Sequence, residues 1–133
     1  MTLKVQLVKD NKVIVEVPLE REGWEKEALE LELEEFESTL DSIAEVHGLF
    51  SNKVRVKMLS EVIRFSDRRF SEFMNILNAN QKIVSENLRR LATNGLVERI
   101  EKKRGEVHYV PTDLGFTSII ACMVMHRILD ELE

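Results

Sequence analysis

The sequence predicts an α+β fold that is mainly α, with an N-terminal β-hairpin and an acidic helix ahead of a more basic part. Over most of the chain apolar residues recur at alternating spacings of three and four, which is typical of amphipathic helices. Two other stretches alternate apolar and polar residues on both sides of a turn, as the strands of a hairpin do. The chain has 133 residues, 44% of them hydrophobic, which suffices for one packed core.

The N-terminal stretch predicts a β-hairpin. A period of two runs through Leu3–Val8 and resumes in Val13–Val17, with the turn-forming pair Asp10-Asn11 between them. Pro18 ends the second strand because proline donates no ladder hydrogen bond. A lone hairpin is marginally stable in water, so we expect it to pack on another surface.

The segment Glu25–His47 predicts a single helix, with Gly48 as its C-cap. Apolar residues form a heptad seam on one face, and the other faces are mostly glutamate. The seam consists of Leu29, Leu33, Phe36, Leu40 and Ile43. It either pairs with a second chain or covers the core of its own domain, and the sequence leaves both open.

Three further helices follow. One starts at Ser51 and ends at a break over residues 65–67, and a short one spans Arg69–Leu77. A turn at residues 78–80 leads into the third, Gln81–Thr93, for which Asn80 is a good N-cap. Their inward-facing residues are Val54, Met58, Leu59, Val62, Phe70, Phe73, Leu77, Val84, Leu88 and Leu91.

A second hairpin and a final helix complete the chain. Asn94-Gly95 ends the preceding helix, and Leu96–Glu101 alternates as a strand. A basic turn, residues 102–105, leads to a return strand over Glu106–Val110. The last helix starts at Thr112-Asp113, just after a proline.

This order of elements is that of a winged helix-turn-helix, in which two helices are joined by a short turn and followed by a hairpin, the wing. Residues 50–118, about half of the chain, resemble the core of HxlR-like and ArsR-like transcription regulators of bacteria and archaea. The resemblance rests on Arg69-Phe70-Ser71-Glu72-Phe73, Val84-Ser85 with Leu88 and Leu91, Gly95-Leu96-Val97, Val107-Tyr109 and Thr112 to Gly115. It implies a homodimer that binds DNA.

The charge is unevenly distributed. The formal net charge is −5, which alone argues against a nucleic-acid binder. Residues 1–50 carry −8 and residues 112–133 carry −3, but residues 51–111 carry +6. The basic part coincides with the predicted helix-turn-helix and wing, so charge no longer argues strongly against double-stranded DNA as a partner.

The helix Gln81–Thr93 is the predicted recognition helix, since its polar side faces away from its apolar anchors. Residues near the start of such a helix enter the major groove deepest, so we expect Gln81, Lys82 and Ser85 to contact base edges. Arg89 is expected on a base or a phosphate, and Arg90 on a phosphate. The wing tip should contact the backbone or minor groove through Lys102, Lys103 and Arg104.

The alternative is that these are ordinary solvated surfaces. The protein would then be a winged-helix protein-interaction or adaptor module without a specific DNA site, as its acidic N-terminal half favours. The acidic segment, if the protein does bind DNA, would lie away from the phosphates and weaken nonspecific binding.

The last helix is apolar on all sides through its middle, so several of its sides must be covered. We expect it to form a homodimer interface, alone or with the acidic helix. The expected interface residues are Phe116, Ile119, Ile120, Met123, Val124, Leu33, Phe36 and Leu40. In the other interpretation the N-terminal hairpin and acidic helix bury this helix within a monomer. The chain is thus predicted to divide into an extension (1–50), a DNA-binding core (51–115) and a dimerisation helix (116–133).

No arrangement of residues predicts catalysis, so we expect no enzyme activity, metal site or cofactor. His126 and Asp130 are four residues apart and could form half of a site across a dimer, but an interface histidine is the simpler interpretation. The single cysteine, Cys122, and the absence of a long apolar run favour a cytoplasmic protein without a membrane span. Whether a small molecule or a protein acts as effector is left open.

Overall fold

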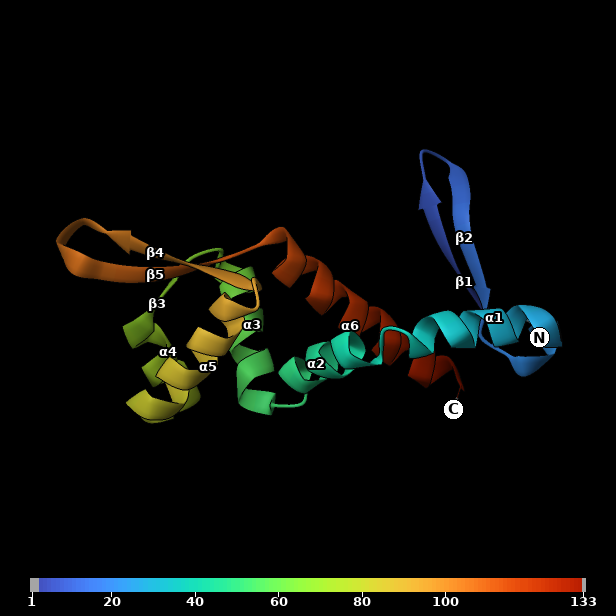
Figure 1. Ribbon diagram of the computed structural model, residues 1–133. Coiled ribbons are helices and arrows are strands. Elements are labelled where there is room, and N and C mark those ends of the chain that lie inside the picture. The colour runs from blue at the N-terminus through green and yellow to red at the C-terminus, as the bar shows by residue number, and fades with distance from the viewer. Residues whose placement is uncertain (1–2, 133) are drawn as a thin grey trace. The chain divides into compact units, whose positions relative to one another are not determined.

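The computed structural model describes residues 3–132. It divides into two compact units, Met1–Ala44 and Glu45–Glu133, which are described separately below. Within the described residues there are six α-helices and five β-strands (Figure 1), so the predicted mainly α class of α+β fold is confirmed.

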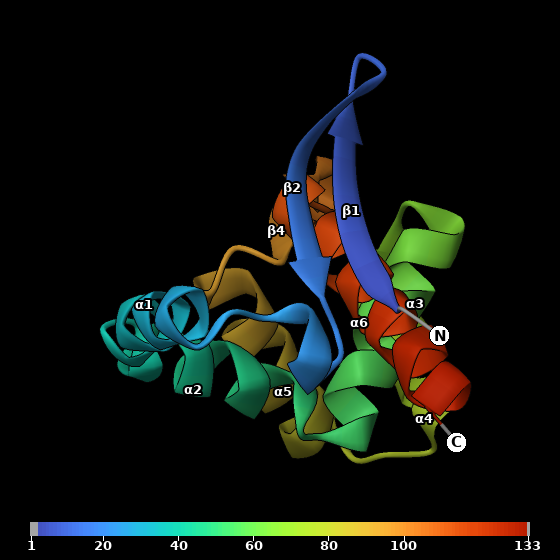
Figure 2. The ribbon, with the colours of Figure 1, turned by 90° about the vertical axis from the view of Figure 1, so that its right-hand side faces the viewer.

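The N-terminal unit begins with the predicted hairpin, β1 (Lys4–Lys9) and β2 (Lys12–Pro18) (Figure 2). Asp10 and Asn11 have φ angles of 51° and 64°, which a tight turn matching the strand twist requires. The register shifts just after Leu7, so the predicted period of two breaks near the tip. The apolar residues exposed around the tip are Leu7, Val8, Val13, Ile14 and Val15.

The prediction of one acidic helix over Glu25–His47 is wrong. A short 3-10 turn precedes two helices, α1 (Lys26–Glu37) and α2 (Leu40–Phe50). At the break, the Ser38 and Thr39 hydroxyls donate to the carbonyls of Glu35 and Phe36, at 2.6 and 2.9 Å. Such side-chain bonds compete with the helical ladder and favour an interruption.

Gly48 does not end a helix, contrary to the prediction, because α2 continues to Phe50. The next helix, α3 (Lys53–Phe65), has Asn52 and not Ser51 as its N-cap. The Asn52 side chain accepts a hydrogen bond from the backbone N–H of Arg55 at 3.0 Å.

The helix-turn-helix consists of α4 (Phe70–Leu77) and α5 (Gln81–Thr93). Asn78 ends α4 in the left-handed conformation, with φ 48°. The side chain of Asn80 caps α5 as predicted, by accepting from the N–H of Ile83 at 2.9 Å.

The wing has three strands, β3 (Arg68–Arg69), β4 (Val97–Lys102) and β5 (Glu106–Pro111), in the order β3-β5-β4. The sequence predicts β4 and β5 to within one or two residues but assigns Arg69 to a helix instead of to β3. The tip is a short 3-10 turn, Lys103–Gly105, in which Arg104 has a φ of 70°. The β4–β5 hairpin reaches out beside α4 and α5 (Figure 1).

The last helix, α6 (Asp113–Leu132), lies beside α3 (Figure 2). Gly115 lets α6 approach the backbone of Leu96 so closely that a Cβ would collide with the Leu96 carbonyl oxygen. The core between α3, α4, α5 and the wing contains Leu49, Met58, Leu59, Val62, Phe73, Val84, Leu88, Leu91, Leu96, Val97 and Tyr109. Within residues 3–132 no helix combines the length and the apolar character that a membrane crossing needs.

Candidate nucleic-acid interface

Helix α5 has one side buried in the core and one side in solvent. Val84 and Leu88 are 0% exposed and Leu91 is 1% exposed, so the predicted apolar anchors are confirmed. The polar residues of the other side are all exposed, and they are Gln81, Lys82, Ser85, Glu86, Arg89 and Arg90.

A buried arginine also holds the back of α5. The guanidinium of Arg55, which is 4% exposed, donates through Nε to the side-chain oxygen of Asn87 at 3.1 Å. Its Nη1 donates to the carbonyls of Gly48 and Leu49, both at 3.1 Å. Burial lowers the pKa of Arg55 below its usual value. Arg55 therefore ties the end of α2 to the recognition helix.

Helix α4 is fixed at its start by Glu72. This carboxylate accepts from the backbone N–H of Arg69 at 2.9 Å and from the Arg68 guanidinium at 2.6 Å. The backbone hydrogen bond is the main reason why the pKa of Glu72 is lowered. Arg68 also contacts the buried Glu61 at 3.2 Å and stacks over the ring of Phe65 at 3.7 Å. The guanidinium of Arg68 is thus held by contacts within the protein.

Ion pairs join the part of the wing next to its tip to the turn before β3. His108 lies between two carboxylates, with Nδ1 2.6 Å from Asp67 and Nε2 3.0 Å from Glu106. Asp67 also binds Lys102 at 2.7 Å, and Glu106 binds Arg69 at 2.9 Å. The hydrogen bond to Glu106, with that to Asp67, raises the pKa of His108. Lys102 and then His108 lower the pKa of Asp67, and His108 and then Arg69 lower the pKa of Glu106, so each carboxylate is compensated locally.

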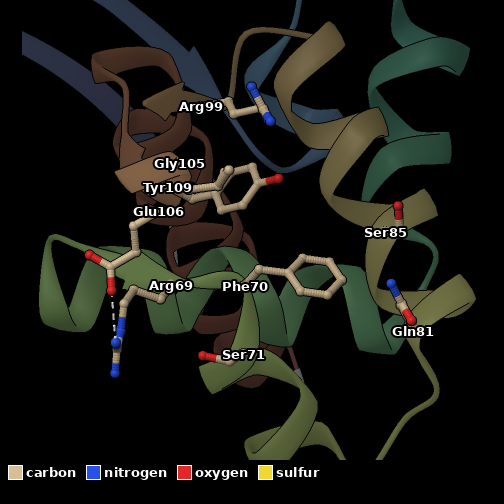
Figure 3. A pocket seen from close by; sticks show the side chains of 10 residues that line it. Arg69, Phe70, Ser71, Gln81, Ser85, Arg99, Gly105, Glu106 and Tyr109 are labelled. Atoms are coloured by element: carbon tan, nitrogen blue, oxygen red, sulfur yellow. Dashed lines mark hydrogen bonds and ion pairs between the residues drawn. The ribbon is translucent and has the colours of Figure 1, made fainter. Parts of the chain in front are cut away.

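A groove of about 530 Å³ separates α4 and α5 from the wing (Figure 3). Gln81 and Ser85 of α5 line one wall, and Arg99 and Tyr109 of the wing line the other. The Tyr109 ring is anchored on Phe73 in an edge-to-face contact, with ring centroids 6.2 Å apart. The groove is open to solvent, and most of the side chains that line it are polar.

The predicted DNA-contacting residues lie around this groove. Lys82 lines an adjoining hollow beside Gln81, and Arg89 lines another together with Arg99. Lys103 and Arg104 are exposed at the wing tip, whereas the nearby Lys102 is paired with Asp67. Arg90 is exposed on α5 but lines none of these three hollows.

The residues predicted for a dimer interface fall on two separate units. On α6, Phe116, Ile120, Met123 and Val124 are 40–52% exposed, while Ile119 packs partly against the core. In the N-terminal unit, Leu33 and Phe36 of α1 and Leu40 of α2 are 43–50% exposed. The apolar faces predicted to meet a partner are therefore each uncovered within their own unit.

The sequence prediction missed Arg99 and Tyr109 as groove residues, and Arg55 and Asn87 as supports of α5. Strand periodicity alone could have placed Arg99 on the same side as the buried Val97. No local pattern signals the Arg55–Asn87 contact, because the two residues are 32 positions apart.

The fold is shared with solved structures of winged-helix transcription regulators. A regulator of the MarR family from Enterococcus faecalis V583 is 21% identical, with a TM-score of 0.61 over 70% of this chain and 86% of its own. The homodimeric winged helix-turn-helix DNA-binding domain Mb0332 from Mycobacterium bovis is 22% identical, with a TM-score of 0.58 over 71% and 87%. A mutant of MarR from E. coli, solved with operator DNA, is 20% identical, with a TM-score of 0.52 over 58% and 56%.

The chain belongs to the HxlR-like helix-turn-helix family, whose model matches residues 49–131. This match covers more than half of the chain and confirms the resemblance inferred from the sequence. No curated protein matches the chain. The protein is thus a member of a family of DNA-binding winged-helix transcription regulators.

Proposed function

We propose that the protein is a homodimeric transcription regulator that binds specific sequences in double-stranded DNA. Helix α5 would enter the major groove, with Gln81, Lys82 and Ser85 at base edges. Arg89 would contact a base or a phosphate, and Arg90 a phosphate. The wing tip, residues 102–105, would contact the backbone or the adjacent minor groove.

The observation that carries this proposal is the two-sided character of α5. A helix can read base edges only if it is held rigidly from behind and presents polar side chains in front. Val84, Leu88 and the Arg55–Asn87 hydrogen bond hold α5 from behind. Its exposed side carries amide, hydroxyl and cationic groups, which match the hydrogen-bonding groups of bases and phosphates.

The exposed apolar side of α6 supports a homodimer. Phe116, Ile120, Met123 and Val124 are spaced so that they share one face of the helix, and each is 40% exposed or more. Contiguous apolar surface of this kind is typical of an interface. A dimer would set two copies of α5 about one DNA turn apart. Light scattering should give twice the chain mass of 15.5 kDa, and a mass of 15.5 kDa would exclude the dimer.

A gel shift with DNA from the region flanking the protein's own gene tests the proposal. Selection from a pool of random duplexes, repeated with a Gln81→Ala variant, then asks whether α5 reads bases. We expect the variant to relax the preference at one position by about 1–3 kcal/mol. If the wild type and Gln81→Ala prefer the same bases at every position, Gln81 does not contact a base edge.

The wing is tested by reversing two charges, Lys103→Glu with Arg104→Glu. This variant should weaken binding to all sequences, because phosphate contacts carry no sequence information. The matched control reverses Lys9 and Lys12 at the tip of the other hairpin, which are also exposed cations next to a turn. Equal losses in both variants would point to a general charge effect and not to a DNA-contacting wing.

The second candidate function is a protein-interaction or adaptor module. The net charge of −5 and the acidic α1 favour it, since both oppose nonspecific attraction to DNA. A protein that enriches no sequence from random duplexes, yet remains folded and dimeric, would support this second candidate over the first.

A further inference from the structure

The groove between α5 and the wing contains a phenol hydroxyl that is turned into it. Tyr109 is 7% exposed, and its hydroxyl points into the groove (Figure 3). At the groove surface this hydroxyl makes no hydrogen bond with residues 3–132 and is accessible to solvent, and therefore also to a ligand. The Phe73 contact fixes the ring, so the hydroxyl is held in place for a ligand.

A cation lies next to this hydroxyl. Arg99 and Tyr109 are direct partners in the β4–β5 ladder, so their side chains emerge on the same face of the wing. Both line the groove, and Figure 3 shows the guanidinium of Arg99 on the side of the groove that faces α5. Its one ion pair, with Glu101 at 3.1 Å, is between exposed side chains and holds it weakly.

The other groove residues add neutral donors. Ser85 and Gln81 lie on α5, and Ser71 lies on α4 (Figure 3). The only carboxylate among the lining residues, Glu106, is already bound by Arg69 at 2.9 Å and by His108 at 3.0 Å. A guanidinium with hydroxyl and amide donors around it is the chemistry that binds one phosphate group.

We propose that Arg99 and Tyr109 form a seat for one phosphate of the DNA backbone. This inference rests on the proposed function. In a duplex, a strand of phosphates separates the major groove from the adjacent minor groove. A protein that places α5 in the major groove and its wing tip at the minor groove must therefore have that phosphate strand between the two elements. The groove of the protein lies between α5 and the wing.

The shape of the groove favours a strand over a small free anion. Arg99 and Tyr109 also line a second hollow of about 270 Å³ that runs along α5 past Ser85 and Arg89. The two hollows share Ser85, Arg99 and Tyr109, so they meet at residues of both walls, and a ligand that occupies both must extend beyond the two seat residues. Inorganic phosphate has the same chemistry as the backbone phosphate, and the experiment below separates the two.

The test measures DNA affinity by fluorescence anisotropy over a series of KCl concentrations, for the wild type, Arg99→Gln and Tyr109→Phe. Losing one phosphate contact should reduce the slope of log affinity against log salt by about 0.9 per subunit in Arg99→Gln. Tyr109→Phe keeps the ring and removes only the uncharged hydroxyl. It should lower affinity roughly tenfold per subunit and leave the slope unchanged.

The control is Lys53→Gln, which removes one exposed cation at the start of α3, outside the groove. It should leave both the affinity and the slope unchanged. If Arg99→Gln has the wild-type slope while the wild type binds DNA, the phosphate seat is wrong and the proposed function stands. If the wild type binds no DNA at all, the proposed function is wrong, and the phosphate seat is wrong with it.

A final arm replaces KCl by potassium phosphate at constant ionic strength and follows the phosphorus NMR signal. For a seat that serves DNA, inorganic phosphate should bind no more tightly to the wild type than to Arg99→Gln. Phosphate binding that Arg99→Gln abolishes, combined with an unchanged salt slope for DNA, would assign the seat to a free anion and overturn the inference.

Discussion

Because Asn87 bonds the buried Arg55, replacing Asn87 at the back of α5 by alanine should reduce the stability of the fold substantially. Asn87→Ala removes the acceptor of the Arg55 Nε, 3.1 Å away, and leaves part of a guanidinium that is 4% exposed without a partner. It also removes the bond from the Asn87 amide to the Ile83 carbonyl at 2.9 Å. A hydrogen bond to a charged group contributes about 1.5–3 kcal/mol and a neutral one about 0.5–1.5 kcal/mol, so the loss should total roughly 2–4.5 kcal/mol.

Urea unfolding measures this loss, at one fixed protein concentration because the stability of a dimer depends on it. The control is Asn94→Ala, which removes a solvent-accessible bond of 2.7 Å from an asparagine amide to the Arg90 carbonyl. That variant should cost less than about 1 kcal/mol, and Asn87→Asp, which keeps the acceptor, should recover most of the stability. Equal costs for the two alanine variants would refute the view that Arg55 depends on Asn87.

Three other predictions concern the wing, the close approach of α6 and the dimer. Contacts led by Glu106 raise the pKa of His108, so its contribution to stability is complete below the ordinary value of 6.5 and is lost as pH rises through the raised value. His108→Gln should therefore flatten the urea stability profile above about pH 6, and an unchanged profile would contradict the contact. Gly115→Ala should destabilise the fold by about 1–3 kcal/mol, because its Cβ meets the Leu96 carbonyl; thermal unfolding checks this, and a stabilised variant would refute it. Val124→Lys should reduce the light-scattering mass to 15.5 kDa if this face of α6 forms the dimer.

Local signals were sufficient for most of the helix-turn-helix. The spacing of Val84, Leu88 and Leu91 predicts the buried side of α5, and Asn80 predicts where the helix begins. Both signals work because neighbouring residues alone determine them: helix period in the first case and side-chain capping in the second. The Asp10-Asn11 turn is predicted for the same reason.

The predictions that were wrong or incomplete involve contacts between residues distant in sequence, or side-chain hydrogen bonds that compete with those of the helix. Strand β3 has two residues, too few to show a period, and it exists because Arg68 and Arg69 pair with β5. The break at Ser38 interrupts a heptad pattern that continues across it, so the hydrophobic spacing gave no warning. The strand pattern predicts the return strand that contains Tyr109, but the position of Tyr109 in the groove depends on α5, which no strand pattern reveals.

Counting ion pairs changes what the basic segment implies about DNA. Residues 51–111 carry +6, but many of their cations are bound to carboxylates within the protein. Lys57, Arg64 and Arg68 bind Glu61. Arg69 binds Glu106 next to the wing tip, and Lys102 binds Asp67 in the turn before β3. The cations of this segment that contact no acidic side chain or buried partner among residues 3–132 are Lys53, Lys82, Arg89, Arg90, Lys103 and Arg104.

All of these free cations except Lys53 lie on α5 or at the wing tip, and the weakly held Arg99 lies between those two places. Each subunit thus offers about six cations to phosphates, which limits the salt slope of a dimer to roughly −11. A steeper slope would mean that paired residues such as Lys102 exchange their carboxylates for phosphates on binding. Since Lys102 and His108 share Asp67 and the charge of Lys102 lowers the pKa of His108, that exchange would raise this pKa further and make DNA binding depend on pH. Anisotropy titrations over salt at two pH values distinguish the two cases, because a slope within the limit and independent of pH requires the ion pairs of Lys102 and His108 with Asp67 to stay intact.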